Sequence, residues 1–157
     1  MFHVVDDAPY MQELLVEMLD EMGHEARSFS SALDYLAFVH SDEFAPPSAV
    51  ISDVRMPNMS GYDLMKSVQE IHPDIRFVMM TGEAALRDEY RNHACMYLGK
   101  PFDFTSLRKV IDAIAECEAD GPSAEIGCAC LDDRERFAIE GDWSCPHPCP
   151  NSEIIQS

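Results

Sequence analysis

Short apolar runs alternate with helical apolar stripes through residues 1–119, and this alternation constrains the fold more than any other feature of the sequence. The runs lie at residues 2–5, 25–29, 49–51, 77–80 and 95–98. Apolar residues spaced three and four apart follow most of these runs, which predicts strands that alternate with helices. Strands joined through helices run parallel with right-handed crossovers, and the helices cover both faces of the sheet. We therefore predict an α/β domain built on a doubly wound, five-stranded parallel sheet.

The helical stripes differ in strength along the chain. Residues 11–22, 32–39, 64–71 and 107–114 each carry apolar side chains on one helical face. Residues 83–93 are highly charged and show little apolar periodicity, so the helix expected there has the weakest support. The second apolar run, at 25–29, is polar enough to indicate a strand at the edge of the sheet.

A polar residue stands just past the end of four of these runs. The residues are Asp6 and Asp7, Asp53, Thr81 and Lys100. Taken singly, each is an ordinary turn former, helix N-terminus or surface residue. In a parallel sheet, however, the carboxyl ends of the strands face the same way, and ligands bind there. We therefore expect three carboxylates, one hydroxyl and one ammonium group to converge on a single crevice.

This combination of groups suits phosphoryl chemistry. Three ionised carboxylates repel one another unless a divalent cation lies between them, and all-oxygen ligands favour Mg²⁺ or Mn²⁺. Lys100 supplies a positive charge and Thr81 a hydroxyl donor for phosphoryl oxygens. A carboxylate nucleophile, a metal ion and a nearby cation are what transfer of a phosphoryl group to a carboxylate requires.

Four motifs in this order resemble the response regulator receiver domain of two-component signalling, of the chemotaxis type, over residues 2–119. The motifs are V-V-D-D at 4–7, D-V-R-M-P-N-M-S-G at 53–61, M-T-G at 80–82 and Y-L-G-K-P at 97–101. The resemblance implies a flavodoxin-like fold with strand order 2-1-3-4-5. We take residues 1–119 as the receiver domain and residues 120–157 as a separate tail.

The resemblance also implies roles for the residues at the strand ends. Asp53 would accept a phosphoryl group from a histidine kinase or a phosphotransfer protein. Asp7 and Asp53 would ligate Mg²⁺ directly, with the backbone carbonyl of Arg55, and Asp6 would act mainly through water. Thr81 and Lys100 would bind the phosphoryl oxygens, and the peptide bond after Lys100 would be cis.

The family likeness further implies a switch. Thr81 would move toward the phosphoryl group, and Tyr97 would follow from an outward to an inward rotamer. The surface made by the fourth helix, at 83–93, the fifth strand and the last helix would then change its affinity for a downstream protein, whose identity the sequence does not reveal. The same surface is where we expect any homodimer to form.

Two charged residues flank the predicted site. Arg55 lies two residues after the acceptor, and Glu83 lies two residues after Thr81. The simpler interpretation is a pair of solvated surface charges. The alternative hypothesis is that they pair across the mouth of the site and tune the lifetime of the phosphoryl group by controlling water access.

The tail is acidic and rich in cysteine and proline. Two close pairs of thiols stand out, Cys128 with Cys130 and Cys145 with Cys149. Paired thiols brought together by a loop hold zinc tetrahedrally, but these spacings differ from the common two-residue knuckles. Three interpretations stay open at this point: a Zn²⁺ site, a disordered or redox-active tail, and an iron–sulfur site.

Charge and composition limit which partners, location and function the protein can have. The formal net charge is −18, from 11 basic and 29 acidic residues, which argues against binding nucleic acid or anionic membranes. No apolar run approaches the length of a membrane span, and no signal peptide is evident, so we expect a cytoplasmic protein. We predict a stand-alone signalling receiver and not an enzyme. Two rivals are a haloacid-dehalogenase-like phosphatase and a phosphorylation-independent metal-binding interaction protein.

Overall fold

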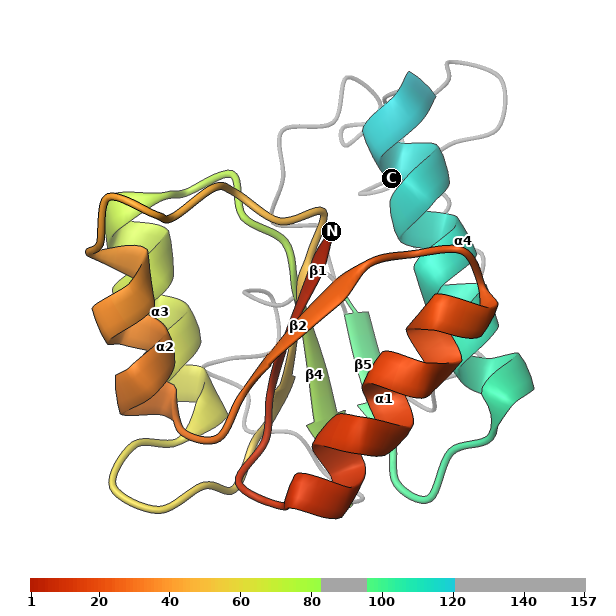
Figure 1. The fold of residues 1–157 in the computed structure, drawn as a ribbon, viewed down its shortest axis with the longest axis horizontal. Helices are drawn as coiled ribbons and strands as arrows, with labels where there is room; N and C mark the ends of the chain where they lie inside the picture. The colour runs from red at the N-terminus through yellow and green to blue at the C-terminus, as the bar shows by residue number, and fades with distance from the viewer. Residues whose placement is uncertain (83–95, 121–157) are drawn as a thin grey trace, which may run out of the picture.

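The computed structural model describes residues 1–82 and 96–120, and these form a five-stranded parallel sheet flanked by helices (Figure 1). The strand order is β2-β1-β3-β4-β5, which confirms the predicted doubly wound topology. The strands are β1 (Phe2–Val5), β2 (Ala26–Phe29), β3 (Val50–Asp53), β4 (Phe77–Thr81) and β5 (Met96–Gly99). The helices are α1 (Pro9–Glu21), α2 (Ala32–Val39), α3 (Gly61–Ile71) and α4 (Phe104–Asp120).

Local sequence signals set the ends of the helices. Ser31 and Ser60 precede α2 and α3, and each side-chain oxygen accepts a hydrogen bond from the backbone amide three residues on. Asp103 does the same for the Ser106 amide at the start of α4. Gly23 adopts a φ of 83° just after α1, a conformation that glycine reaches without steric cost. These residues fix where α2, α3 and α4 begin and where α1 ends.

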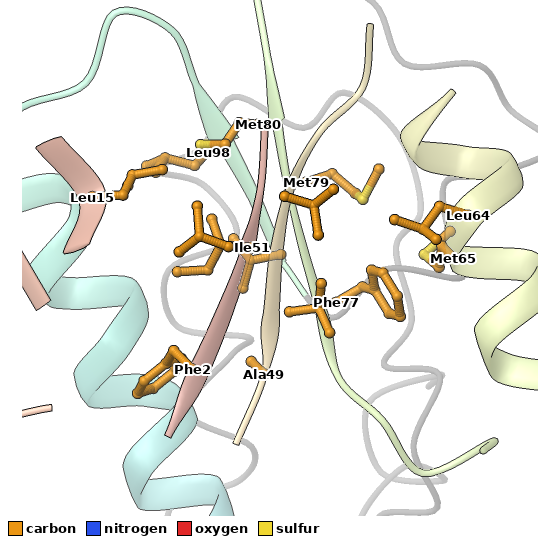
Figure 2. Packing of buried hydrophobic residues seen from close by; sticks show 14 of the residues in the cluster. Phe2, Leu15, Ala49, Ile51, Leu64, Met65, Phe77, Met79, Met80 and Leu98 are labelled. Atoms are coloured by element: carbon orange, nitrogen blue, oxygen red, sulfur yellow. The ribbon is translucent and has the colours of Figure 1, made fainter. Parts of the chain in front are cut away.

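The helices lie on both sides of the sheet, α1 and α4 on one face and α2 and α3 on the other (Figure 1). Alternate residues of the central strands therefore face different helices. In β4, Phe77 and Met79 lie on the α3 side, whereas Met80 lies with Leu15 of α1 on the opposite side (Figure 2). Every residue of β1, β3 and β4 is buried except Asp53 at the end of β3, because both faces of these strands are covered. The edge strand β2 is more exposed, as its polar sequence predicted.

The structure refines several predicted boundaries. Asp53 and Thr81 are the last residues of β3 and β4, so the strands extend one residue or more past their apolar runs. Helix α4 continues to Asp120, one residue beyond the predicted end of the receiver domain. The predicted helix at 83–93, Glu83 and the four tail cysteines lie outside the described residues. Within the described ranges, no helix is both long and apolar enough to cross a membrane.

Candidate phosphoryl-accepting site

The carboxyl ends of β1, β3, β4 and β5 meet at one edge of the sheet, as the sequence predicted. An open cleft of about 360 Å³ lies there. It is lined by Asp53, Val54, Arg55, Thr81, Gly82 and Lys100. The parallel register aligns these strand ends, since Asp53 pairs with Met80 and Thr81 pairs with Gly99. The cleft therefore lies where the doubly wound sheet favours ligand binding.

Lys100 lies between two of the carboxylates. Its Nζ is 3.1 Å from Asp53 Oδ1 and 3.8 Å from Asp6 Oδ2. The backbone amide of Lys100 also donates to the Thr81 carbonyl at 2.8 Å, which ties the end of β5 to the end of β4. The peptide bond between Lys100 and Pro101 is cis, as the family resemblance implied. The lysine ammonium group is thus held inside the cleft next to the predicted acceptor.

Asp6 is the most deeply buried of the three acids. Its Oδ1 accepts a hydrogen bond from the Ala8 amide at 2.9 Å, and its backbone carbonyl accepts one from Gln12 Nε2 at 2.8 Å. Its Oδ2 is buried and has no hydrogen-bond partner among the described residues. Burial raises the pKa of Asp6 above its usual value, the Ala8 amide opposes this, and the charge of Asp53 adds to the rise.

The three aspartates fit a hard divalent cation. One carboxylate oxygen from each of Asp6, Asp7 and Asp53 lies within 4.8 Å of the other two. Asp6 is buried, Asp53 is partly exposed and Asp7 is exposed, so the cluster opens toward solvent on one side. Lys100 offsets only one of the three negative charges, and Asp6 Oδ2 accepts no hydrogen bond from the described residues. Mg²⁺, which takes carboxylates and keeps waters, would satisfy this oxygen and offset the remaining charge.

The structure places the other predicted site residues as follows. Thr81 is buried at the end of β4 and lines the cleft. Arg55 is exposed at the mouth of the same cleft. Tyr97 lies in β5, paired with Met79, and the structure describes its backbone only. The described residues therefore bring together Asp6, Asp7, Asp53, Arg55, Thr81 and Lys100, whereas Glu83 lies outside them.

Three further residues support the site, and the sequence assigned none of them a contact with it. Gln12 holds the Asp6 backbone, and Ser52 Oγ donates to the Asp53 carbonyl oxygen at 3.0 Å. Gly61 begins α3 directly against that same carbonyl group. Glycine directly before a helical stripe was the one available signal, since it marks a place where the backbone comes close to another group.

The fold and the site together define an α/β domain with a lysine–carboxylate cluster at the topological switch point. Residues 2–112 match the family described as the response regulator receiver domain. The chain therefore belongs to the response regulator receiver family, the signalling domain of two-component systems. This membership favours neither the phosphatase nor the interaction-protein alternative. In addition, the phosphatase would need an acid two residues after Asp53, where this chain has Arg55.

Individual relatives agree with this assignment. The chain is 32% identical over 112 residues to the DNA-binding transcriptional regulator NtrC of Proteus hauseri. The aligned region covers 69% of this chain and 23% of that protein. The chain thus spans about a quarter of the length of that relative. The structure of the chemotaxis protein CheY4 of Vibrio cholerae is 25% identical, with a TM-score of 0.62, and covers 72% of this chain and 96% of that one. The regulator TrrA of Thermotoga maritima, in complex with Mg²⁺-BeF, is 26% identical with a TM-score of 0.60, over 72% of this chain and 96% of TrrA.

Proposed function

We propose that this chain is a two-component receiver that accepts a phosphoryl group on Asp53 and thereby switches a surface that binds a partner protein. The observation that carries the proposal is the Lys100 ammonium group 3.1 Å from the Asp53 carboxylate, in a cleft lined by Thr81 and next to two further aspartates. The proposed donor is the phosphohistidine of a histidine kinase or of a phosphotransfer protein, as in the family.

Each residue has a distinct task in the proposed reaction. A carboxylate oxygen of Asp53 forms the new bond to phosphorus, while the bond between phosphorus and the donor imidazole nitrogen breaks. Lys100 moves from its pairing with Asp53 to the developing charge on the phosphoryl oxygens, and the Thr81 hydroxyl donates to another of them. Both groups are already at the cleft, so the transfer needs little rearrangement of the backbone.

Mg²⁺ would be held by Asp6, Asp7 and Asp53, with the Arg55 carbonyl as a further ligand. When bound, it neutralises charge on the carboxylates and on the phosphoryl oxygens. The complex of TrrA with Mg²⁺-BeF supports this choice of metal. Asp6 anchors the acidic cluster, because Gln12 holds its backbone carbonyl and the Ala8 amide holds one of its carboxylate oxygens.

The proposed output is a change of surface. Thr81 would follow the phosphoryl group, and Tyr97 in β5 would change rotamer with it, which alters the face formed around β5 and α4. A downstream protein, or a second copy of this chain, would bind that face in one state only. The Zn²⁺ hypothesis for Cys128, Cys130, Cys145 and Cys149 stays a separate prediction about the tail.

The test of the proposed function is the intact mass of the protein after incubation with Mg²⁺ and acetyl phosphate. Wild type is expected to gain the mass of one phosphoryl group, and EDTA added beforehand is expected to prevent the gain. Asp53→Asn keeps the size of the side chain but removes the nucleophile, so it is expected to gain nothing. A folded wild type that gains no mass, or an Asp53→Asn variant that gains as much as wild type, would contradict the proposal.

A second prediction concerns Arg55, which is exposed at the mouth of the cleft. If its side chain limits the approach of water to the acyl phosphate, Arg55→Ala is expected to shorten the lifetime of phosphorylated Asp53 by several-fold. The decay of the adduct after removal of the donor measures this lifetime directly. Arg55→Lys keeps the positive charge but lacks the planar guanidinium group, so it distinguishes an effect of the charge from an effect of the side-chain shape. Unchanged decay in Arg55→Ala would rule out the role, and Glu83→Ala tests the other half of the hypothesis.

A further inference from the structure

We infer that Gly61, the first residue of α3, is a positioning residue for Asp53 and for the metal-binding loop that follows it. A Cβ atom on Gly61 would lie 2.2 Å from the Asp53 carbonyl oxygen and 2.7 Å from Met79 Cε. Real Cβ atoms essentially never come within 3.0 Å of such a neighbour, so any side chain at this position forces a shift of most of an ångström against the carbonyl oxygen and of a few tenths against Met79 Cε. The inference rests on the function proposed above, since it concerns the same acceptor and the same metal.

The two contacts would not share this displacement equally. Met79 Cε is the end of a flexible side chain and can rotate away. The Asp53 carbonyl oxygen is fixed, because it accepts a hydrogen bond from Ser52 Oγ at 3.0 Å and because Asp53 pairs with Met80 in the β3–β4 ladder. A side chain at residue 61 is therefore expected either to shift the acceptor backbone or to push the start of α3 away from it.

Gly61 also closes the loop between β3 and α3. Its amide donates to the Val54 carbonyl at 2.8 Å, and the Val54 amide donates to the Met80 carbonyl at 3.1 Å. The residues between these ends include Arg55, whose carbonyl is the proposed Mg²⁺ ligand. Gly61 thus sets the position of both the Asp53 backbone and the end of the loop that carries Arg55. Groups that bind a metal or react must be held within about 0.5 Å of their productive positions.

The experiment compares Gly61→Ala with the matched control Ser60→Ala. Ser60 caps the same helix, with its Oγ 3.1 Å from the Asp63 amide, but its loss puts no atom against Asp53. Both variants are expected to unfold at lower urea concentration than wild type. Only Gly61→Ala is expected to weaken Mg²⁺ binding, measured by calorimetry, by about tenfold to a hundredfold, the range seen when groups that orient metal ligands are lost. Ser60→Ala is expected to keep the wild-type affinity.

A measurement on wild type does not depend on how well the variant folds. The backbone amide resonance of Gly61 is expected to shift when Mg²⁺ is added, because this amide is hydrogen-bonded to the metal-binding loop. The Mg²⁺ concentration at half of the shift is expected to equal the midpoint of the calorimetric titration. Equal Mg²⁺ affinity in wild type and folded Gly61→Ala, or a Gly61 resonance that saturating Mg²⁺ leaves unmoved, would overturn the inference and leave the proposed function standing. If wild type itself binds no Mg²⁺, the proposed function fails, and the inference fails with it.

Discussion

Replacing Asp6 by asparagine is expected to stabilise the metal-free protein and to remove most of its stabilisation by Mg²⁺. The Asp6 side chain is 1% exposed, and one of its oxygens has no hydrogen-bond partner among the described residues. Burial raises its pKa, which means that the folded state disfavours the ionised form. A neutral amide of the same size removes this buried negative charge, so the free energy of unfolding of the metal-free protein is expected to rise. The side-chain carbonyl in Asp6→Asn would keep the bond from the Ala8 amide.

The metal is expected to reverse the order of stability. If Mg²⁺ binds the folded state only, as proposed, then at about a hundred times its dissociation constant it adds roughly 2.7 kcal/mol to the free energy of unfolding of wild type. Asp6→Asn lacks one carboxylate and is expected to gain much less. Urea unfolding in EDTA and in Mg²⁺ measures both effects.

The matched control is Asp7→Asn, because Asp7 belongs to the same cluster but is exposed. It is expected to lose Mg²⁺ stabilisation without becoming more stable in EDTA. An Asp6→Asn variant that is less stable than wild type in EDTA would show that the nearby Lys100, 3.8 Å away, compensates the buried charge fully.

The positions of the residues around the cleft could be predicted because strand ends are visible in a sequence. Asp53, Thr81 and Lys100 each follow an apolar run, and parallel strands align their ends. What the sequence could not distinguish is Asp6 from Asp7. The Asp6 amide still donates to the Phe29 carbonyl of β2 at 3.2 Å, which keeps Asp6 against the sheet and buried, whereas Asp7 is exposed. That difference decides which acid is sensitive to desolvation.

Contacts between residues that are separated in the sequence could also not be predicted from it. The approach of Gly61 to the Asp53 carbonyl depends on how the intervening loop closes, which no periodicity encodes. His3 gave an even weaker signal, because it stands in the apolar run of β1 and is as buried as the residues around it. Its hydrogen-bond partner, Tyr35, lies 32 residues away in α2. Burial of a polar group is explained only when such a partner is known.

Acid is expected to destabilise this protein through His3. The side chain is 1% exposed, and its Nδ1 lies 3.0 Å from the Tyr35 hydroxyl. The rings of four aromatic residues surround it: Phe29, Tyr35, Phe38 and Phe44. Burial, followed by the charges of Arg27 and the N-terminus, lowers the pKa of His3 to about 4 from a usual value of 6.5. Arg27 itself lies over the Phe38 ring at 4.3 Å, so a second positive charge is already present at this cluster.

The sign of the effect follows from proton binding. Between pH 6.5 and pH 4, the unfolded chain protonates this histidine and the folded protein does not. The free energy of unfolding therefore falls as the pH falls through this window, by on the order of 3 kcal/mol from His3. Above pH 6.5 both states hold a neutral imidazole, and the contribution is constant.

The measurement is urea unfolding from pH 7 to pH 4 in wild type and in the double variant His3→Phe/Tyr35→Phe. The double variant removes both hydrogen-bonding partners together, which leaves no buried polar group without a partner. Carboxylates titrate in the same window in both proteins, so the difference between the two pH profiles isolates His3. We expect wild type to lose about 3 kcal/mol more than the variant between pH 7 and pH 4. Parallel profiles would mean that the folded protein accepts a proton on His3, which this aromatic surrounding and the nearby Arg27 both oppose.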